Sequence, residues 1–346
     1  MKKNKIIFII IGIVLVVALG VLLGFKFIGK NNKTNNNEKN TNIKEKEEKK
    51  ITIIDLDSNT RPYAVMINTH NAALPQSGLQ DAYIVYELMV EGGITRMMAL
   101  FKDVDFDKVG SIRSARAQYL PYVYENDAIY VHAGGSKEAL ELIQSEKIND
   151  IDVDGKYGVR DKGLNRAYEH TLFTNTSLLK QAINDKGLRS TTDNHSLLKY
   201  SAKEIDLSKY ETSKKANNVS IRYSNYRTSI YNYDAENKVY SRYLNNTKNV
   251  DLVTGEEYKV KNIIAYALNH TTYTDHGYYG YQKIDNIGTG EGVYISNGYS
   301  IPIVWTKNSR TEKTIYTIKE TGEELVVNDG NTYIQIYPSD GSLSIE

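Results

Sequence analysis

Arginine side chains are the clearest candidates for chemistry in this sequence. Arg96 follows the pair Gly92-Gly93, and Arg113 and Arg116 lie three residues apart further along the chain. A guanidinium group binds the oxygens of a phosphate or carboxylate group in pairs through its planar fork of N–H donors. The sequence therefore predicts that Arg96, Arg113 and Arg116 bind an anionic ligand.

Carboxylates and a histidine near these arginines suggest further roles. Glu87 and Glu91 precede Arg96, and as metal ligands they would hold Mg²⁺ beside a phosphate group. Because imidazole titrates near neutral pH, His132 is a candidate general base, with Asp81 as the second catalytic candidate. The alternative interpretation is structural: ion pairs between arginines and glutamates, and a histidine held in the interior. No cofactor other than Mg²⁺ is indicated.

A glycine turn supplies a second candidate for anion binding. Gly134, Gly135 and Ser136 follow a predicted strand, and Ser136 is placed to cap a helix over residues 137–145. Free backbone N–H groups at a helix start attract anions. We expect the turn to complete a cradle for the ligand, although most turns of this composition only reverse the chain.

The elements that position these residues follow from hydrophobic patterning. Tyr63–Ile67 reads as a buried strand, and residues 81–90 and 94–101 read as a hairpin around Gly92-Gly93. A helix through Glu125 would place Arg113 and Arg116 on one side. Another helix is predicted over residues 177–186. Residues 51–205 are therefore expected to form an α/β domain, a mixed sheet with flanking helices.

The second half of the chain has a different pattern. Helical periodicity disappears from Val219 onward, and short β-rich runs separated by turns follow. Eighteen of the 28 tyrosines lie between Tyr210 and Tyr337. We expect residues 215–346 to form a tyrosine-rich, antiparallel all-β domain. Its tyrosines are interpreted chiefly as half-buried packing residues, with stacking on sugar rings as the alternative.

The first fifty residues predict a membrane anchor. Residues 6–25 contain no charged side chain, and as a helix they would span about 30 Å, the thickness of a bilayer core. We expect a cytoplasmic tail (1–5), a single transmembrane helix (6–28) in contact with the lipid bilayer, and a disordered linker (29–50). The rest of the chain would be extracellular. A cleaved signal peptide is the alternative.

Composition excludes several classes of function. The 43 Lys and Arg residues nearly balance the 42 Asp and Glu residues, which argues against nucleic-acid binding through bulk positive charge. Cysteine is absent, so disulfides, thiolate nucleophiles and cysteine-based metal sites are excluded. A lysine- and asparagine-rich, cysteine-free ectodomain suits a Gram-positive cell envelope.

Several motifs closely resemble the YerB-like surface-protein family, a two-module family of unknown function. They are Arg61–Asn68, Pro75–Leu79, Glu91–Arg96, Gly110–Arg116 and His132–Ser136, with Trp305–Lys307 and Asn328–Ile334 in the second module. Members are often lipoproteins, whereas this chain lacks the cysteine that would carry the lipid. The resemblance covers nearly all of residues 55–340 and implies no established activity.

Residues 79–155 are also similar, more distantly, to LytR–CpsA–Psr phosphotransferases, which attach glycopolymers to peptidoglycan. Asp81, the Arg113/Arg116 pair and Gly134-Gly135 fall in a similar order, but the Arg-Asp of those enzymes is replaced here by Arg113-Ser-Ala-Arg116. We expect an extracytoplasmic protein that binds an anionic ligand such as a cell-wall glycopolymer. The alternative is a phosphotransferase acting on a polyprenyl-pyrophosphate-linked glycopolymer, and the sequence leaves open whether the protein is an enzyme.

Overall fold

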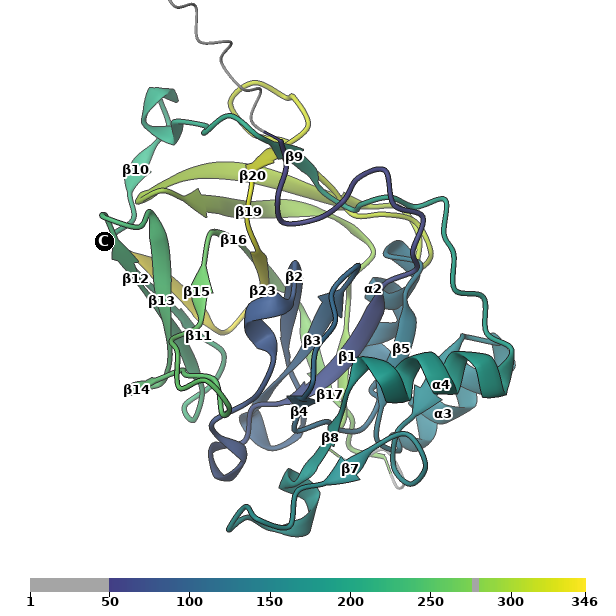
Figure 1. The fold of residues 1–346 in the computed structure, drawn as a ribbon. Coiled ribbons are helices and arrows are strands. Elements are labelled where there is room, and N and C mark those ends of the chain that lie inside the picture. Colours follow the sequence, from purple (N-terminus) through teal and green to yellow (C-terminus); the bar gives the residue numbers. More distant parts are fainter. Residues whose placement is uncertain (1–49, 276–279) are drawn as a thin grey trace, which may run out of the picture. The chain divides into compact units, whose positions relative to one another are not determined.

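The computed structural model describes residues 50–275 and 280–346 (Figure 1). The predicted tail (1–5), transmembrane helix (6–28) and nearly all of the linker (29–50) lie outside these residues. Within the described ranges, no helix combines the length and the hydrophobicity needed to cross a membrane.

One large mixed sheet organises the described chain. Its eleven strands include the order β10-β20-β19-β16-β23-β2-β3-β1-β5-β6, and β21 pairs with β20. The bounds are β1 (Tyr63–Asn68), β2 (Ile84–Met89), β3 (Thr95–Phe101), β5 (Ile129–His132), β6 (Asp150–Asp152), β10 (Lys214–Lys215), β16 (Asn262–Leu268), β19 (Gly288–Ser296), β20 (Tyr299–Lys307), β21 (Ile315–Ile318) and β23 (Thr332–Pro338).

Strands from the two predicted domains share this sheet. β2 pairs in parallel with β23, with Ile84 opposite Thr332 and Leu88 opposite Ile336. The mixed sheet and the largely β second half agree with the expected fold class. The exact boundaries of the two domains stay a prediction.

The short strands of the second half led us to expect an antiparallel arrangement throughout, and one pair departs from it. β16 and β23 run parallel along their whole length. The reason is the long excursion through β19, β20 and β21, which returns the chain to the end where β16 began. The expectation was wrong for this pair.

Smaller sheets flank the large one. A six-stranded sheet has the order β14-β13-β12-β11-β24, with β15 beside β13 (Figure 1). Its strands are β11 (Asn218–Arg222), β12 (Thr228–Asp234), β13 (Val239–Leu244), β14 (Thr247–Lys248), β15 (Lys259–Val260) and β24 (Ser342–Ile345). The remaining strands are β4 (Val109–Gly110), β7 (Val159–Arg160), β8 (Leu172–Thr174), β9 (Lys199–Ser201), β17 (His270–Thr272), β18 (Gln282–Ile284) and β22 (Val326–Asn328).

Two of the predicted helices are confirmed. α3 (Lys137–Ser145) begins after Ser136, whose hydroxyl accepts a hydrogen bond from the Ala139 N–H. α4 (Thr176–Lys186) is capped by Asn175 and ends at Gly187, which adopts the left-handed conformation.

The helix expected to contain Arg113 and Arg116 begins later. A 3-10 turn, η4 (Ala117–Tyr119), leads into α2 (Leu120–Glu125), and Arg116 is extended, with φ −136° and ψ 139°. The cause is backbone pairing, because the Arg113 N–H donates to Met66 and the Ala115 N–H donates to Gly134. The prediction of a helical turn at these arginines was wrong.

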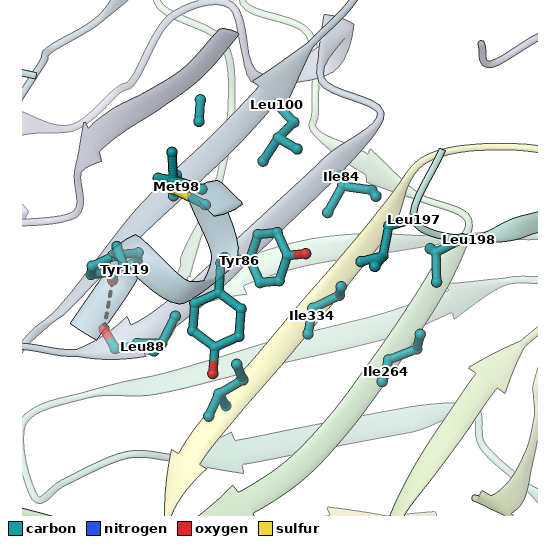
Figure 2. Close-up of a cluster of buried hydrophobic side chains, with 14 of the residues drawn as sticks. Ile84, Tyr86, Leu88, Met98, Leu100, Tyr119, Leu197, Leu198, Ile264 and Ile334 are labelled. Atoms are coloured by element: carbon teal, nitrogen blue, oxygen red, sulfur yellow. Dashed lines mark hydrogen bonds between the residues drawn. The ribbon is translucent and has the colours of Figure 1, made fainter. Parts of the chain in front are cut away.

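Both faces of the central sheet are covered, which determines where β2 places its side chains. Ile84, Tyr86 and Leu88 pack with Ile264 and Ile334 in one core, as Figure 2 shows. Val85, on the opposite face, belongs to a second core shared with the six-stranded sheet. Glu87 lies on this second face and is buried. The face of β2 that looked polar in sequence is therefore an interior face.

Candidate functional site

The candidate site lies at one edge of the central sheet. β1, β5 and β6 run parallel, so their carboxyl ends meet there. β3 runs antiparallel to β1, and this places Arg96, near the start of β3, directly opposite Asn68 at the end of β1. In sheets with parallel strands, ligands bind preferentially outside the carboxyl ends.

Arg96 forms the buried base of the arginine cluster, which we define as Arg96, Arg113 and Arg116. Its side chain is 4% exposed and donates to the Ser114 carbonyl oxygen at 2.6 Å. Burial, together with the positive charge of Arg116, lowers the pKa of Arg96 to about 9, which leaves it charged at neutral pH. The guanidinium groups are therefore close enough to repel one another, and a bound anion would relieve that repulsion.

Arg116 is held by a carboxylate. Its guanidinium binds both oxygens of Glu91, with Nη2 3.1 Å from Oε2, and also donates to the Ala115 carbonyl oxygen. The ring of Tyr281 lies under it, 5.4 Å from the guanidinium carbon. This pairing matches the structural alternative for Arg116, although both charged side chains keep some exposure to solvent.

Arg113 is the most available of the three. It donates to the Glu169 carbonyl oxygen at 3.2 Å, and the Glu169 carboxylate favours its charge without forming an ion pair within 4 Å. Burial, the largest influence, lowers the pKa of Arg113. In the described part of the chain, the cluster thus holds three guanidinium groups against two carboxylates, only one of which bonds directly to an arginine.

A pocket of about 200 Å³ lies beside Arg113. Arg160 also lines it, stacked 3.5 Å from the Tyr168 ring and paired with Asp154 at 2.8 Å. Pockets that enclose drug-sized ligands are larger, ~300–1,000 Å³. The volume suits one charged group of a larger ligand. The lining residues are Ile112, Arg113, Ser114, Ala133, Asp154, Arg160, Tyr168, Glu169 and Leu172.

Two of the three N–H groups of the glycine turn donate to partners within the protein. The Gly134 N–H donates to the Asp152 carboxylate at 3.1 Å, and the Ser136 N–H donates to the Ala115 carbonyl oxygen. Gly134 has a positive φ of 57°, and a side chain at Gly135 would approach Leu140 to 2.7 Å. These contacts explain the residue types at 134–136 without a ligand. Their ligand-binding role stays a prediction.

His132 is enclosed at the end of β5. It is 1% exposed, with Nδ1 2.8 Å from the Gly134 carbonyl oxygen and Nε2 3.3 Å from the Asp150 carboxylate. Both ring nitrogens therefore have partners within the protein. This geometry favours a structural histidine over a general base.

Two of the predicted acidic residues lie away from the arginine cluster. Asp81 precedes β2, whereas Arg96 pairs with Leu88 near its other end, so roughly 20 Å of extended strand separates them. Burial raises the pKa of Asp81, with a smaller contribution from the charge of Asp251. Glu87 is fully buried and pairs with Arg242. Of the predicted acidic residues, only Glu91 lies at the cluster.

The described residues give no support for a metal site. No group of three or more histidine, aspartate or glutamate side chains within residues 50–275 and 280–346 is arranged to hold a metal ion. Glu87 and Glu91 each contact an arginine instead. Binding of Mg²⁺ by them stays a prediction.

Sequence reasoning missed several residues at this edge. Asn68, His70 and His170 meet there, with the two imidazole rings stacked 5.0 Å apart. Asn68 and His170 are 102 positions apart in sequence. The signal that could have found Asn68 is its position as a polar residue directly after the predicted strand Tyr63–Ile67, which places it at the carboxyl edge of the sheet.

Comparison with known proteins assigns the chain to a family. Residues 51–189 match the description "Protein of unknown function (DUF3048) N-terminal domain", and residues 219–334 match the corresponding C-terminal domain. The chain belongs to this two-module, YerB-like family, as its motifs indicated.

Two relatives agree with this assignment. The chain is 32% identical over 293 residues to the protein named "Putative lipoprotein YerB" of Bacillus subtilis (strain 168), covering 82% of this chain and 83% of that protein. It also matches the crystal structure of YerB from Bacillus subtilis, with a TM-score of 0.70, 28% identity, and coverage of 83% of this chain and 94% of that one.

Proposed function

We propose that this protein binds an anionic ligand of the cell envelope through the arginine cluster. The observation that carries the proposal is Arg113, a half-buried guanidinium beside a pocket, bonded to a backbone carbonyl oxygen rather than to a carboxylate. A buried or half-buried cation without a bonded counter-ion is costly. An anion in the pocket would supply the counter-charge.

Binding is ranked above phosphotransfer because the catalytic candidates are dispersed or occupied. Asp81 lies at the far end of β2, and both nitrogens of His132 already have partners. Phosphoryl transfer needs groups that position the nucleophile and neutralise developing charge at one point. The arginine cluster alone supplies charge but no base.

The proposed location is the outer surface of the cell membrane. A relative named as a lipoprotein supports an anchored, extracellular protein. For this chain we propose residues 6–28 as the anchor in place of a lipid, with the N-terminus in the cytoplasm. The cell envelope of a Gram-positive organism then supplies anionic glycopolymers next to the pocket.

A sedimentation assay on cell walls tests the proposal. Full-length wild type, Arg113→Gln and Arg222→Gln are mixed with isolated walls, before and after teichoic acids are stripped. Arg222 is the matched control because it lies on β11, where its side chain contacts Ser342 and the Asp340 carbonyl oxygen. We expect wild type and Arg222→Gln to sediment with intact walls, and Arg113→Gln to stay largely in solution.

Two outcomes would count against binding as the function. Equal sedimentation of all three proteins would remove the role of the arginine cluster. Release of phosphate or transfer of polymer by the wild type, absent from Arg113→Gln, would instead favour the phosphotransferase.

A further inference from the structure

Asn68 has a defined orientation at the candidate site. Its Oδ1 accepts a hydrogen bond from the His70 backbone N–H at 3.0 Å. A backbone N–H cannot act as an acceptor, so the oxygen of the amide must point toward it. The Nδ2 of Asn68 consequently points to Nδ1 of His170, 2.9 Å away.

This orientation determines which nitrogen of His170 carries a proton. Because Nδ1 accepts a hydrogen bond from the Asn68 amide, a neutral His170 must be protonated at Nε2. His70 is in the same state, since its Nδ1 accepts from the Ala72 N–H at 3.1 Å. The structure therefore presents two stacked imidazole rings, both protonated on Nε2.

His170 and Arg113 are both neighbours of Glu169. The Glu169 carbonyl oxygen accepts from Arg113 at 3.2 Å, and Nε2 of His170 is 3.9 Å from the Glu169 carboxylate, too far for a hydrogen bond. The His170 side chain is 7% exposed. Burial, with the positive charges of Arg113 and Arg166, lowers the pKa of His170, while the Glu169 carboxylate opposes that shift. The lowered pKa favours the neutral form of the ring.

We propose that His170 is a ligand-binding residue that donates from Nε2 to an oxygen of the anion bound by Arg113, and that Asn68 is the positioning residue that keeps the proton on Nε2. This inference rests on the proposed function and names the ligand class, a phosphate group. A phosphate group has several oxygens, so it can accept hydrogen bonds from the guanidinium fork and from a separate imidazole donor at the same time.

The proton position is tested without any ligand. Nitrogen-15 NMR of the full-length protein at pH 7 distinguishes Nε2–H, Nδ1–H and doubly protonated imidazole. We expect His170 to be Nε2–H in the wild type and to lose that state in Asn68→Asp, where an acceptor replaces the donor facing Nδ1. A wild-type ring in another state, or an unchanged ring in Asn68→Asp, overturns the inference whatever the protein binds.

The donor role is tested by a matched pair of variants. His170→Phe keeps a ring against His70 but has no donor, whereas His170→Gln retains an amide N–H at a similar reach. With inorganic phosphate followed by phosphorus-31 NMR, we expect affinity to fall about tenfold in His170→Phe and to stay within about twofold of wild type in His170→Gln.

The possible results separate the two proposals. If wild type binds phosphate, Arg113→Gln does not, and His170→Phe binds like wild type, the role of His170 is overturned and the proposed function stands. If wild type and Arg113→Gln give the same result, both are overturned. If His170→Phe fails to fold, the proton position in the wild type and in Asn68→Asp still decides the inference.

Discussion

Two clusters of charge, both built around arginine, contrast within this molecule. In the first, Glu87 and Arg242 are 0% and 1% exposed and lie 2.9 Å apart. The Glu87 carboxylate also accepts hydrogen bonds from the hydroxyl groups of Thr95, at 2.7 Å, and Ser229, at 3.0 Å. This pair joins β2 to β13 across the interior, and the buried Arg227 also feels the charge of Glu87.

The second is the arginine cluster at the carboxyl edge, where two of the three arginines bond to no carboxylate. Arg96 bonds to a backbone carbonyl oxygen, Arg113 does the same, and only Arg116 binds a carboxylate directly. The comparison teaches that residue type alone does not assign a role: a glutamate near the end of β2 with an arginine nearby can belong to a structural ion pair or to a binding site. Two features distinguish the structural pair from the candidate binding site: the direct bond between an arginine and a fully buried carboxylate in the first, and the pocket beside Arg113 in the second.

The largest effect is expected from breaking the buried Glu87–Arg242 ion pair. Arg242→Met would leave Glu87 buried without its counter-ion and lower the free energy of unfolding by about 3–5 kcal/mol. Urea denaturation measures this. The double variant Glu87→Gln, Arg242→Met should recover part of the loss, because a neutral amide keeps its bonds to Thr95 and Ser229. A single variant as stable as wild type would contradict the assignment.

His270 offers a third arrangement, a half-buried histidine whose ring nitrogens are buried without a hydrogen-bond partner among the described residues. Burial lowers the pKa of His270 to about 4, although Asp340 and Asp285 act in the opposite direction. The unfolded chain takes up the proton near its ordinary pKa of 6.5.

Stability should therefore fall with acidity in a defined window. Between pH 6.5 and about 4 the unfolded state binds more protons, so the free energy of unfolding decreases as pH falls, by up to about 3 kcal/mol. Thermal unfolding of wild type and His270→Phe across this range checks the prediction. The variant should lack this component, and parallel curves for the two proteins would disprove it.

A smaller effect is expected at the glycine turn. A variant there distinguishes a structural role of the turn from a role in ligand binding. Ser136→Ala removes the cap of α3 and should cost about 1 kcal/mol of stability. Phosphate affinity should not change, because the Ser136 N–H already donates to Ala115. Loss of affinity without loss of stability would restore the turn to the binding site.

The smallest effect should come from releasing Arg116. Glu91→Gln removes the carboxylate that occupies this guanidinium, both being partly exposed. Exposed pairs of this kind contribute about 0.2–1 kcal/mol, so anion affinity should rise by about two- to fivefold. Calorimetric titration with pyrophosphate would detect the gain, and weaker binding would show that Glu91 supports the site rather than competes for it.

Elements with local periodicity were predictable from the sequence. β1, the β2–β3 hairpin, α3 and α4 follow from alternation, capping and glycine turns. The second buried face of β2 was not predictable, because it depends on strands supplied by the other half of the chain. Arg242, the partner of Glu87, lies 155 positions away.

The candidate site was only partly predictable, because many of its contacts join distant parts of the chain. Arg96, Arg113 and Arg116 lie close enough for their charges to interact, although the helical turn predicted to align Arg113 and Arg116 does not form. The sequence did not reveal the hydrogen-bond partners of the other predicted groups. These partners are Asp152 for Gly134, Asp150 for His132 and Asn68 for His170. Each of these contacts depends on tertiary pairing that no local pattern reports.

Calorimetric titration of inorganic pyrophosphate into full-length wild type, Arg113→Gln and Arg222→Gln tests the central claim most directly, since the two variants lose the same charge at different places. Saturable binding by wild type and Arg222→Gln, with affinity reduced about tenfold or more in Arg113→Gln, is the predicted result. Indistinguishable titrations for the three proteins would contradict the claim that the arginine cluster is a binding site.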